Sequence, residues 1–164
     1  MSRPWLRAAS GAVLLLAVAW TLRWAASSPG GVELEPGRLV LRPGEQREVR
    51  LVNREGELVA LSFRLRFDES VVEVDTGPEL PPLAPGGEAV HLPTRRGQGL
   101  VAVPGIALTG ERSFEPGTTL YRFAVRGRQP GTTALEVEAL TVVDRGDALR
   151  ILPVAPAAVT VRAP

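Results

Sequence analysis

The sequence has no cysteine, no lysine and a single histidine, His91. Without cysteine, thiol catalysis, thiolate metal sites and a lipid-modified cysteine anchor are excluded. A lone imidazole makes a poor metal site, and a catalytic triad would require an activated serine beside it. The serines after residue 30 are Ser62, in a run of strand character, and Ser70 and Ser113, in turns, none in a nucleophile-elbow pattern. We therefore expect a chain that is not an enzyme and has no catalytic residue, metal ligand or cofactor.

Tryptophan is missing after residue 24, since Trp5, Trp20 and Trp24 are the only three in the chain. Four of the five aromatic residues that follow stand at apolar positions of alternating runs: Phe63, Phe67, Tyr121 and Phe123. The fifth, Phe114, is predicted to be exposed. Because sugar-binding sites usually stack the sugar on exposed aromatic rings, one free ring argues against a carbohydrate site.

Neither sign of charge is in large excess. All 19 basic residues are arginine, against 18 acidic residues. Arg3, Arg7 and Arg23 lie in the N-terminal segment, and the remainder has 16 arginines and a net charge of −2. A nearly balanced surface gives no electrostatic footprint for nucleic acid or anionic lipid, so we expect neither as a partner of the domain.

Residues 1–30 have the layout of an export signal. A basic start is followed by 15 uncharged residues from Ala8 to Leu22, and Arg23 and a small-residue stretch come next. Fifteen helical residues span about 22 Å, less than the ~30 Å hydrocarbon core, which favours a cleaved signal peptide. The flanking tryptophans and arginines favour a retained membrane anchor at residues 8–22, because such side chains settle at the membrane interface. Either interpretation predicts an exported protein, at the cell surface, in the periplasm or secreted.

From Gly31 onward, the sequence consists of short alternating runs separated by glycine and proline. This pattern predicts an all-β sandwich or barrel in one domain, residues 31–164, and no segment has a helical period. The stretches RPGEQ, NREGE, EPGTT, QPGTT and DRGDA predict turns between the strands. The proline-rich stretch 77–87 should be a surface loop. The runs with one apolar face include 46–53, 60–67, 120–126, 134–140 and 157–163.

The segment GELVALSFRLRFDESVVEVDTG, residues 56–77, carries a resemblance to a known family. Its alternating strand ends at Asp68, and a Val-rich strand follows at once. LRPGEQREVRLVN before it, and GLVAVPG, GTTLYRFAVRG and PGTTALEVEALTVVDRGDAL after it, follow the order of that family's strands. Together these segments resemble a cohesin domain, the β-sandwich module that docks dockerins in cellulosomes and also occurs outside them. The family usually has proline after the aspartate, where this chain has Glu69.

The resemblance implies a jelly-roll β-sandwich of about nine strands. The uncharged run at residues 8–22 predicts a hydrophobic helix before it. It also implies a protein-binding role, with a dockerin-like or other surface or secreted partner. Family contacts lie partly on the outward row of the strand corresponding to 58–67, which implies partner binding at Ser62, Arg64 and Arg66. The polar pair often found at the first two positions of this row is reduced to Ala60 and Ser62, so recognition should differ from the family's.

The sequence leaves two alternatives open. Arg64 and Arg66 lie two residues apart on one strand face, where they would bind carboxylates of a partner or form cross-strand ion pairs on a solvated face. The second alternative concerns function, because related sandwiches include carbohydrate-binding modules.

Two acidic motifs are weaker candidates for a site. Asp68, Glu69 and Asp75 would contribute to a calcium site, but calcium needs six to eight oxygen ligands and no loop has the alternating acidic pattern. The Arg-Gly-Asp tripeptide at 145–147 lies in DRGD, which is a typical hairpin turn. We expect turns at both places.

Overall fold

The computed structural model describes residues 31–76 and 89–163. The predicted N-terminal helix and the predicted loop at 77–87 lie outside these residues. The described chain is entirely β, which confirms the predicted class, and no helix in it is long and apolar enough to cross a membrane. Its strands are β1 (Val32–Glu35), β2 (Arg38–Leu41), β3 (Gln46–Asn53), β4 (Leu58–Arg66), β5 (Val72–Asp75), β6 (Ala89–His91), β7 (Arg95–Gly97), β8 (Leu100–Leu108), β9 (Thr119–Gly127), β10 (Gly131–Asp144), β11 (Leu149–Leu152) and β12 (Ala157–Val161).

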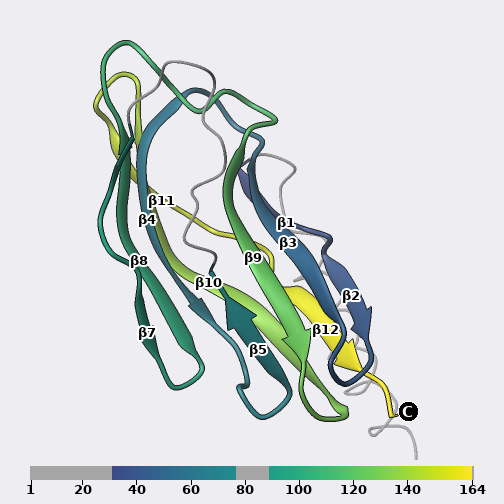
Figure 1. The fold of residues 1–164 in the computed structure, drawn as a ribbon. Coiled ribbons are helices and arrows are strands. Elements are labelled where there is room, and N and C mark those ends of the chain that lie inside the picture. The colour runs from purple at the N-terminus through teal and green to yellow at the C-terminus, as the bar shows by residue number, and fades with distance from the viewer. Residues whose placement is uncertain (1–30, 77–88, 164) are drawn as a thin grey trace, which may run out of the picture.

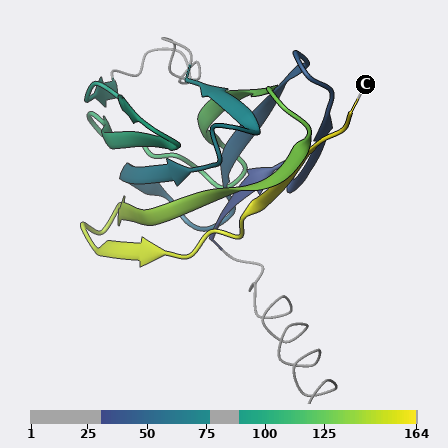
Figure 2. The same ribbon diagram turned by 90° about the horizontal axis from the view of Figure 1, so that it is seen from below.

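The strands form two sheets that pack face to face as a sandwich (Figures 1 and 2). One sheet has four strands in the order β1-β3-β9-β5. The other has the order β2-β12-β10-β4-β8-β6, with β11 paired to β10 and β7 paired to β8. All pairings are antiparallel except that of β12 with β2. The described strands outnumber the expected nine or so because β6, β7 and β11 are separate short strands of three or four residues.

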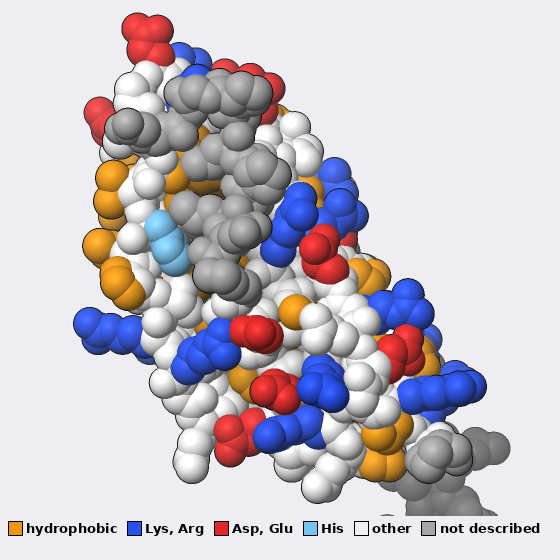
Figure 3. Space-filling view, viewed as in Figure 1, with side chains coloured by type: hydrophobic (Ala, Val, Ile, Leu, Met, Phe, Trp, Pro, Cys, Tyr) orange, Lys and Arg blue, Asp and Glu red, His pale blue; other side chains and the backbone are white. Residues whose placement is uncertain are grey.

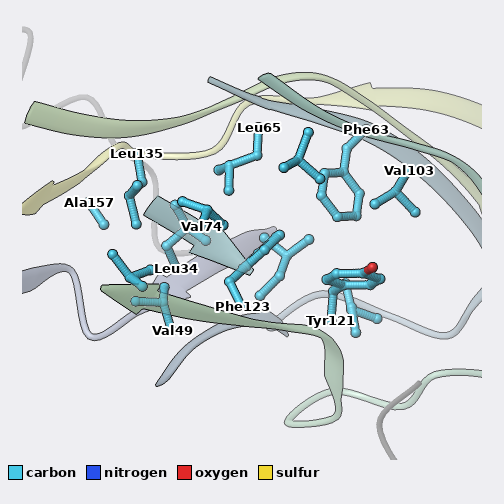
Figure 4. Packing of buried hydrophobic residues seen from close by; sticks show 14 of the residues in the cluster. Leu34, Val49, Phe63, Leu65, Val74, Val103, Tyr121, Phe123, Leu135 and Ala157 are labelled. Carbon is cyan, nitrogen blue, oxygen red and sulfur yellow. The ribbon is translucent and has the colours of Figure 1, made fainter. Parts of the chain in front are cut away.

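The core lies between the sheets and follows from the period-two burial of each strand. Figure 4 shows Phe63 and Leu65 from the eight-stranded sheet pointing toward Tyr121 and Phe123 from the four-stranded sheet. The ring of Phe63 meets those of Tyr121 and Phe123 edge-on, with centroids 5.5 and 5.9 Å apart. Such T-shaped contacts are the favoured geometry of aromatic pairs. This packing confirms the predicted inward faces of 60–67 and 120–126.

The break after β4 is a tight turn. The carboxylate of Asp68 accepts hydrogen bonds from the backbone N–H and the hydroxyl of Ser70, at 2.9 and 2.6 Å. The backbone N–H of Val71 and of Val72 both donate to the carbonyl of Asp68. The chain then enters β5 with Val72 and Val74 buried. The predicted pair of strands divided at Asp68 is therefore confirmed.

Strand β10 is longer than the predicted run at 134–140 and contains a bulge. Ala139 has a φ of 50°, and the pairing with β4 shifts between Glu138 and Thr141. The extra residue resets the alternation, so Leu140 and Val142 are buried in the second half of the strand. The bulge thereby fixes which side chains β10 presents on the outside of the sheet.

Candidate partner-binding face

The outer face of the four-stranded sheet is covered by ion pairs between neighbouring strands. In Figure 3, arginine and acidic side chains alternate over the lower half of the molecule, where β3, β5 and β9 are drawn in Figure 1. These charges neutralise one another across strands, as is usual for a solvated sheet. The pairs are Arg54 with Glu33 and Glu35, Arg50 with Glu35, Arg122 with Glu48, and Arg128 with Glu73. Asp75 on β5 pairs instead with Arg96 on β7 of the other sheet.

The outer face of the eight-stranded sheet differs, because one row across it is entirely apolar. The pairing register places five side chains side by side on strands β11, β10, β4, β8 and β6. Their inward neighbours Leu61, Ile106 and Val142 are buried, so the row itself faces outward. In spatial order the row is Leu149, Val143, Ala60, Ala107 and Val90.

The next row toward the middle of the strands is uncharged. Ile151 on β11 is paired with Thr141, which is paired with Ser62 on β4. Leu92 closes this row after β6, where its N–H donates to the carbonyl of Gly105 at 2.9 Å. A Cβ on Gly105 would lie 3.3 Å from Cδ1 of Leu92, so the missing side chain leaves room for that leucine.

We call these two rows, from Leu149 and Ile151 on β11 to Val90 and Leu92 at β6, the apolar strip. Its centre has small side chains and its two ends have large exposed ones. Leu149 and Ile151 are 68% and 71% exposed, and Val90 and Leu92 are 55% and 49% exposed. Only one other large apolar side chain of the described residues is exposed, Val40. A contiguous exposed apolar patch on one face is typical of a protein interaction surface.

The β10–β11 hairpin, which provides one end of the apolar strip, is held in place by ion pairs. Nη1 of Arg145 in the turn lies 2.6 Å from Oε2 of Glu57, and Nη1 of Arg150 on β11 lies 2.8 Å from Oε1 of Glu55. The hydrogen bond from Arg145, helped by one from Ser113, lowers the pKa of Glu57. This end of the strip is therefore preorganised, which reduces the entropy cost of binding.

The three residues that the sequence places on the binding row do face outward, but they differ in their surroundings. Ser62 lies in the middle of the apolar strip. Nε of Arg66 lies 2.9 Å from Oε1 of Glu138, so the predicted cross-strand ion pair exists there. Arg64 is exposed, and no ion pair of the described residues includes it.

The residues at the ends of the strip are absent from the sequence-based prediction. Leu149 and Ile151 alternate with Arg150 directly after the DRGD turn, and this pattern is the signal that could have identified β11 as a strand with an apolar outer face. Val90 and Leu92 carry no such signal, because β6 has only three residues. Their place on the face depends on pairing with β8.

The carboxylates considered for calcium are each engaged in other contacts. Asp68 caps the turn at Ser70, Glu69 accepts the N–H of Gly99 at 3.1 Å, and Asp75 pairs with Arg96. Within residues 31–76 and 89–163, no cluster of three or more histidine or acidic side chains is arranged to hold a metal ion. The DRGD stretch forms the predicted hairpin turn, in which Asp144 Oδ1 accepts the N–H of Gly146 at 2.9 Å.

The prediction that Phe114 is exposed is wrong. Its side chain is 1% exposed, and its backbone pairs with Leu58 in an antiparallel bridge outside the named strands. The buried amide of Asn53 donates to the Phe114 carbonyl at 2.8 Å, which fixes this segment against the core. None of the aromatic side chains in the described part of the chain is exposed, so this part offers no platform for stacking a sugar.

Comparison with solved structures identifies the fold. A non-cellulosomal cohesin from the archaeon Archaeoglobus fulgidus superposes with a TM-score of 0.58 at 13% identity, covering 80% of this chain and 89% of its own. A cohesin module from a Clostridium perfringens family 33 glycoside hydrolase gives a TM-score of 0.60 at 11% identity, covering 84% and 100%. This chain has the fold of a cohesin module. The sequence-based resemblance is therefore confirmed for the fold.

Other matches to the cohesin-like chain come from complexes. A type I cohesin–dockerin complex of Clostridium thermocellum contains a cohesin that superposes with a TM-score of 0.58 at 13% identity, covering 80% of this chain and 99% of its own. No family model matches the sequence of the cohesin-like chain. No curated protein matches it either.

Proposed function

We propose that this chain is a non-catalytic, protein-binding module and that the apolar strip docks a partner module of dockerin type. The observation that carries the proposal is the contrast between the two outer faces. One sheet neutralises its charges internally, whereas the other exposes four large apolar side chains around a centre of small ones. Solved structures of the same fold include cohesins in complex with dockerins, which supports a dockerin-type partner.

We also propose that the domain works outside the cytoplasm. The basic start and the uncharged run at residues 8–22 support export. The −2 net charge of residues 31–164 and the absence of an exposed aromatic ring among the described residues favour a protein partner over nucleic acid or polysaccharide.

Affinity capture with matched variants tests the docking face. The protein, tagged at its C-terminus and purified from its native host, is used to capture partners from the extracellular and envelope fractions of that host. The test variant is Leu149→Asp with Ile151→Asp, and the control is Val40→Asp, which also places a carboxylate at an exposed apolar site, 42% exposed, on β2. Both variants should stay folded, because all three positions are exposed at the surface.

We expect at least one protein to be retained by the wild type and by Val40→Asp and lost from the double variant. Its affinity for the double variant should fall by about tenfold or more, because the introduced carboxylates would be buried without a partner. Equal retention by all three forms would reject the apolar strip as the docking face. Purified polysaccharides that bind the wild type more tightly than the captured protein would reject the protein-binding function.

A further inference from the structure

The row beside the apolar strip contains two arginines that flank one alanine. Arg64 on β4 and Arg95 on β7 are both paired with Ala102, from opposite sides of β8. Their Cα atoms are therefore two strand spacings apart, about 10 Å. This row lies two residues along β4 from Ser62, so it is about 7 Å from the nearer row of the strip. The residue between the two arginines, Ala102, has only a methyl side chain.

The acidic groups around these arginines are already engaged or are paired with a different residue. Glu138, which is paired with Arg64 across β10, forms its ion pair with Arg66 at 2.9 Å. Glu136, two residues from Glu138 on β10, is paired with Arg66 and not with Arg64. Arg96, next to Arg95, reaches the other way and bonds to Asp75 and Thr76. In the described part of the chain, neither Arg64 nor Arg95 forms an ion pair, whereas Arg50 and Arg122 on the four-stranded sheet do.

We propose that Arg64 and Arg95 form a clamp for a carboxylate of the partner, placed over Ala102. Guanidinium groups bind carboxylates with two parallel N–H donors, and two of them that approach from opposite sides would engage both carboxylate oxygens. The clamp rests on the proposed function, because it assumes that the partner covers the neighbouring apolar strip. Arg66 is excluded from it, since Glu138 occupies its guanidinium.

The clamp and the strip together define the chemistry of the partner. The strip crosses five strands, about 19 Å, which is the length of a helix of about 13 residues. A helix that lies along it would bury an apolar face against Leu149, Ile151, Val90 and Leu92. An aspartate or glutamate on the flank of that helix, above β8, the fourth of the five strands, would reach Ala102. The partner is therefore an amphipathic helical protein with an acid beside its apolar face.

A display library of small three-helix proteins, randomised on the exposed faces of two helices, tests the clamp without knowledge of the natural partner. The library is selected against the immobilised wild-type protein, and the affinities of the selected binders are then measured against variants. The clamp variant is Arg64→Gln with Arg95→Gln. The strip variant is Leu149→Asp with Ile151→Asp. The control is Arg122→Gln on the opposite sheet, which removes one charge from a face outside the proposed site.

We expect the selected binders to be enriched in aspartate and glutamate beside apolar residues. The clamp variant should weaken them by about tenfold or more, the loss typical of a hot-spot arginine, and the control should leave them unchanged. Raising the salt concentration should also weaken their binding to the wild type, and it should weaken their binding to the clamp variant less. This combination of results supports the clamp.

Two other outcomes separate the two proposals. In the first, the binders lose affinity for the strip variant but keep it for the clamp variant, or they are enriched in lysine and arginine. Either result would overturn the clamp and leave the proposed docking face intact. Binders that respond to neither variant would overturn both, because the favoured contact surface of the molecule would then lie elsewhere.

Discussion

Phe63 is part of the contact between the two sheets. It is 3% exposed and contacts the rings of two core residues of the opposite sheet. Phe63→Ala should lower the free energy of unfolding by about 3–5 kcal/mol, through lost burial and the cavity left behind. Urea denaturation measures this change. Arg64→Ala, next to it but exposed, should stay within about 0.5 kcal/mol of the wild type. A loss below 1 kcal/mol for Phe63→Ala would mean that the ring is not in the core.

Asp68 offers a prediction on pH. The hydroxyl of Ser70, and then its backbone N–H, hold the pKa of the Asp68 carboxyl below its ordinary value of 3.8. Because the folded-state pKa is lowered, this carboxylate stabilises the fold above the unfolded pKa, and that contribution is lost as the pH falls through the folded pKa. Ser70→Ala should raise the pKa of Asp68 toward the ordinary value, as an NMR titration of the carboxyl carbon would show. An unchanged pKa in this variant would indicate that the turn is held by other contacts.

Residues with a local sequence signal were predictable, and those placed by distant pairing were not. Alternation alone assigns Phe63 and Phe123 to the core. Phe114 has no alternating neighbours, and its burial depends on a backbone bridge to Leu58, 56 positions earlier in the chain. The ion pair of Arg66 with Glu138 likewise joins residues 72 positions apart. Pairing at such separations is decided by the topology of the sheets.

At the scale of elements, β4 and β9 match the predicted runs, whereas β10 and β11 depart from them. One inserted residue at Ala139 reverses the faces of a strand, and no glycine or proline marks it in the sequence. The bulge directs Thr141 and Val143 to the outer face, where β11 extends the row. The apolar strip was therefore not predictable from alternation alone, and the sequence-based site was limited to the outward row of β4.

The end of β9, at Gly127, lies in close contact with the turn before β3, and this contact can be tested by substitution. The N–H of Gly127 donates to the Glu45 carbonyl at 2.9 Å, and its carbonyl accepts the N–H of Gly44 at 2.8 Å. A Cβ at Gly127 would lie 2.5 Å from the carbonyl oxygen of Arg42. Gly127→Ala should therefore cost about 1–3 kcal/mol, because backbone has to move.

Gly97→Ala is the matched control for this prediction. A Cβ at Gly97 would meet nothing within 4 Å, so this change should stay within about 0.5 kcal/mol of the wild type. Thermal or urea unfolding of both variants measures the difference. Equal stabilities would show that β9 and the turn before β3 are not in close contact in solution.

At the scale of the whole molecule, the export proposal can be tested by fractionation of the native host. A retained anchor predicts a full-length protein that pellets with membranes and resists carbonate extraction. A cleaved signal peptide predicts a soluble species that begins near Ser28, outside the cytoplasm. Full-length protein in the soluble cytoplasmic fraction would contradict export in both forms.

The two faces of the sandwich divide the molecule into a solvated side and a binding side. Ion pairs on the four-stranded sheet are exposed and contribute little stability each, but they leave that surface fully solvated and poor in apolar contacts. The apolar strip on the other sheet contributes no stability while it is exposed to water. Burial of this apolar surface against a partner would contribute favourable free energy to binding. The central claim is that this strip is the docking face.

Hydroxyl-radical footprinting of the protein with and without its captured partner tests this claim most directly. The method reports the solvent exposure of individual side chains by mass spectrometry, and Val40 is an internal reference on the same molecule. We predict that oxidation of Leu149, Ile151 and Leu92 falls strongly in the complex, while oxidation of Val40 is unchanged. Unchanged oxidation of the strip residues, with protection of Val40 or of the four-stranded sheet instead, would contradict the account.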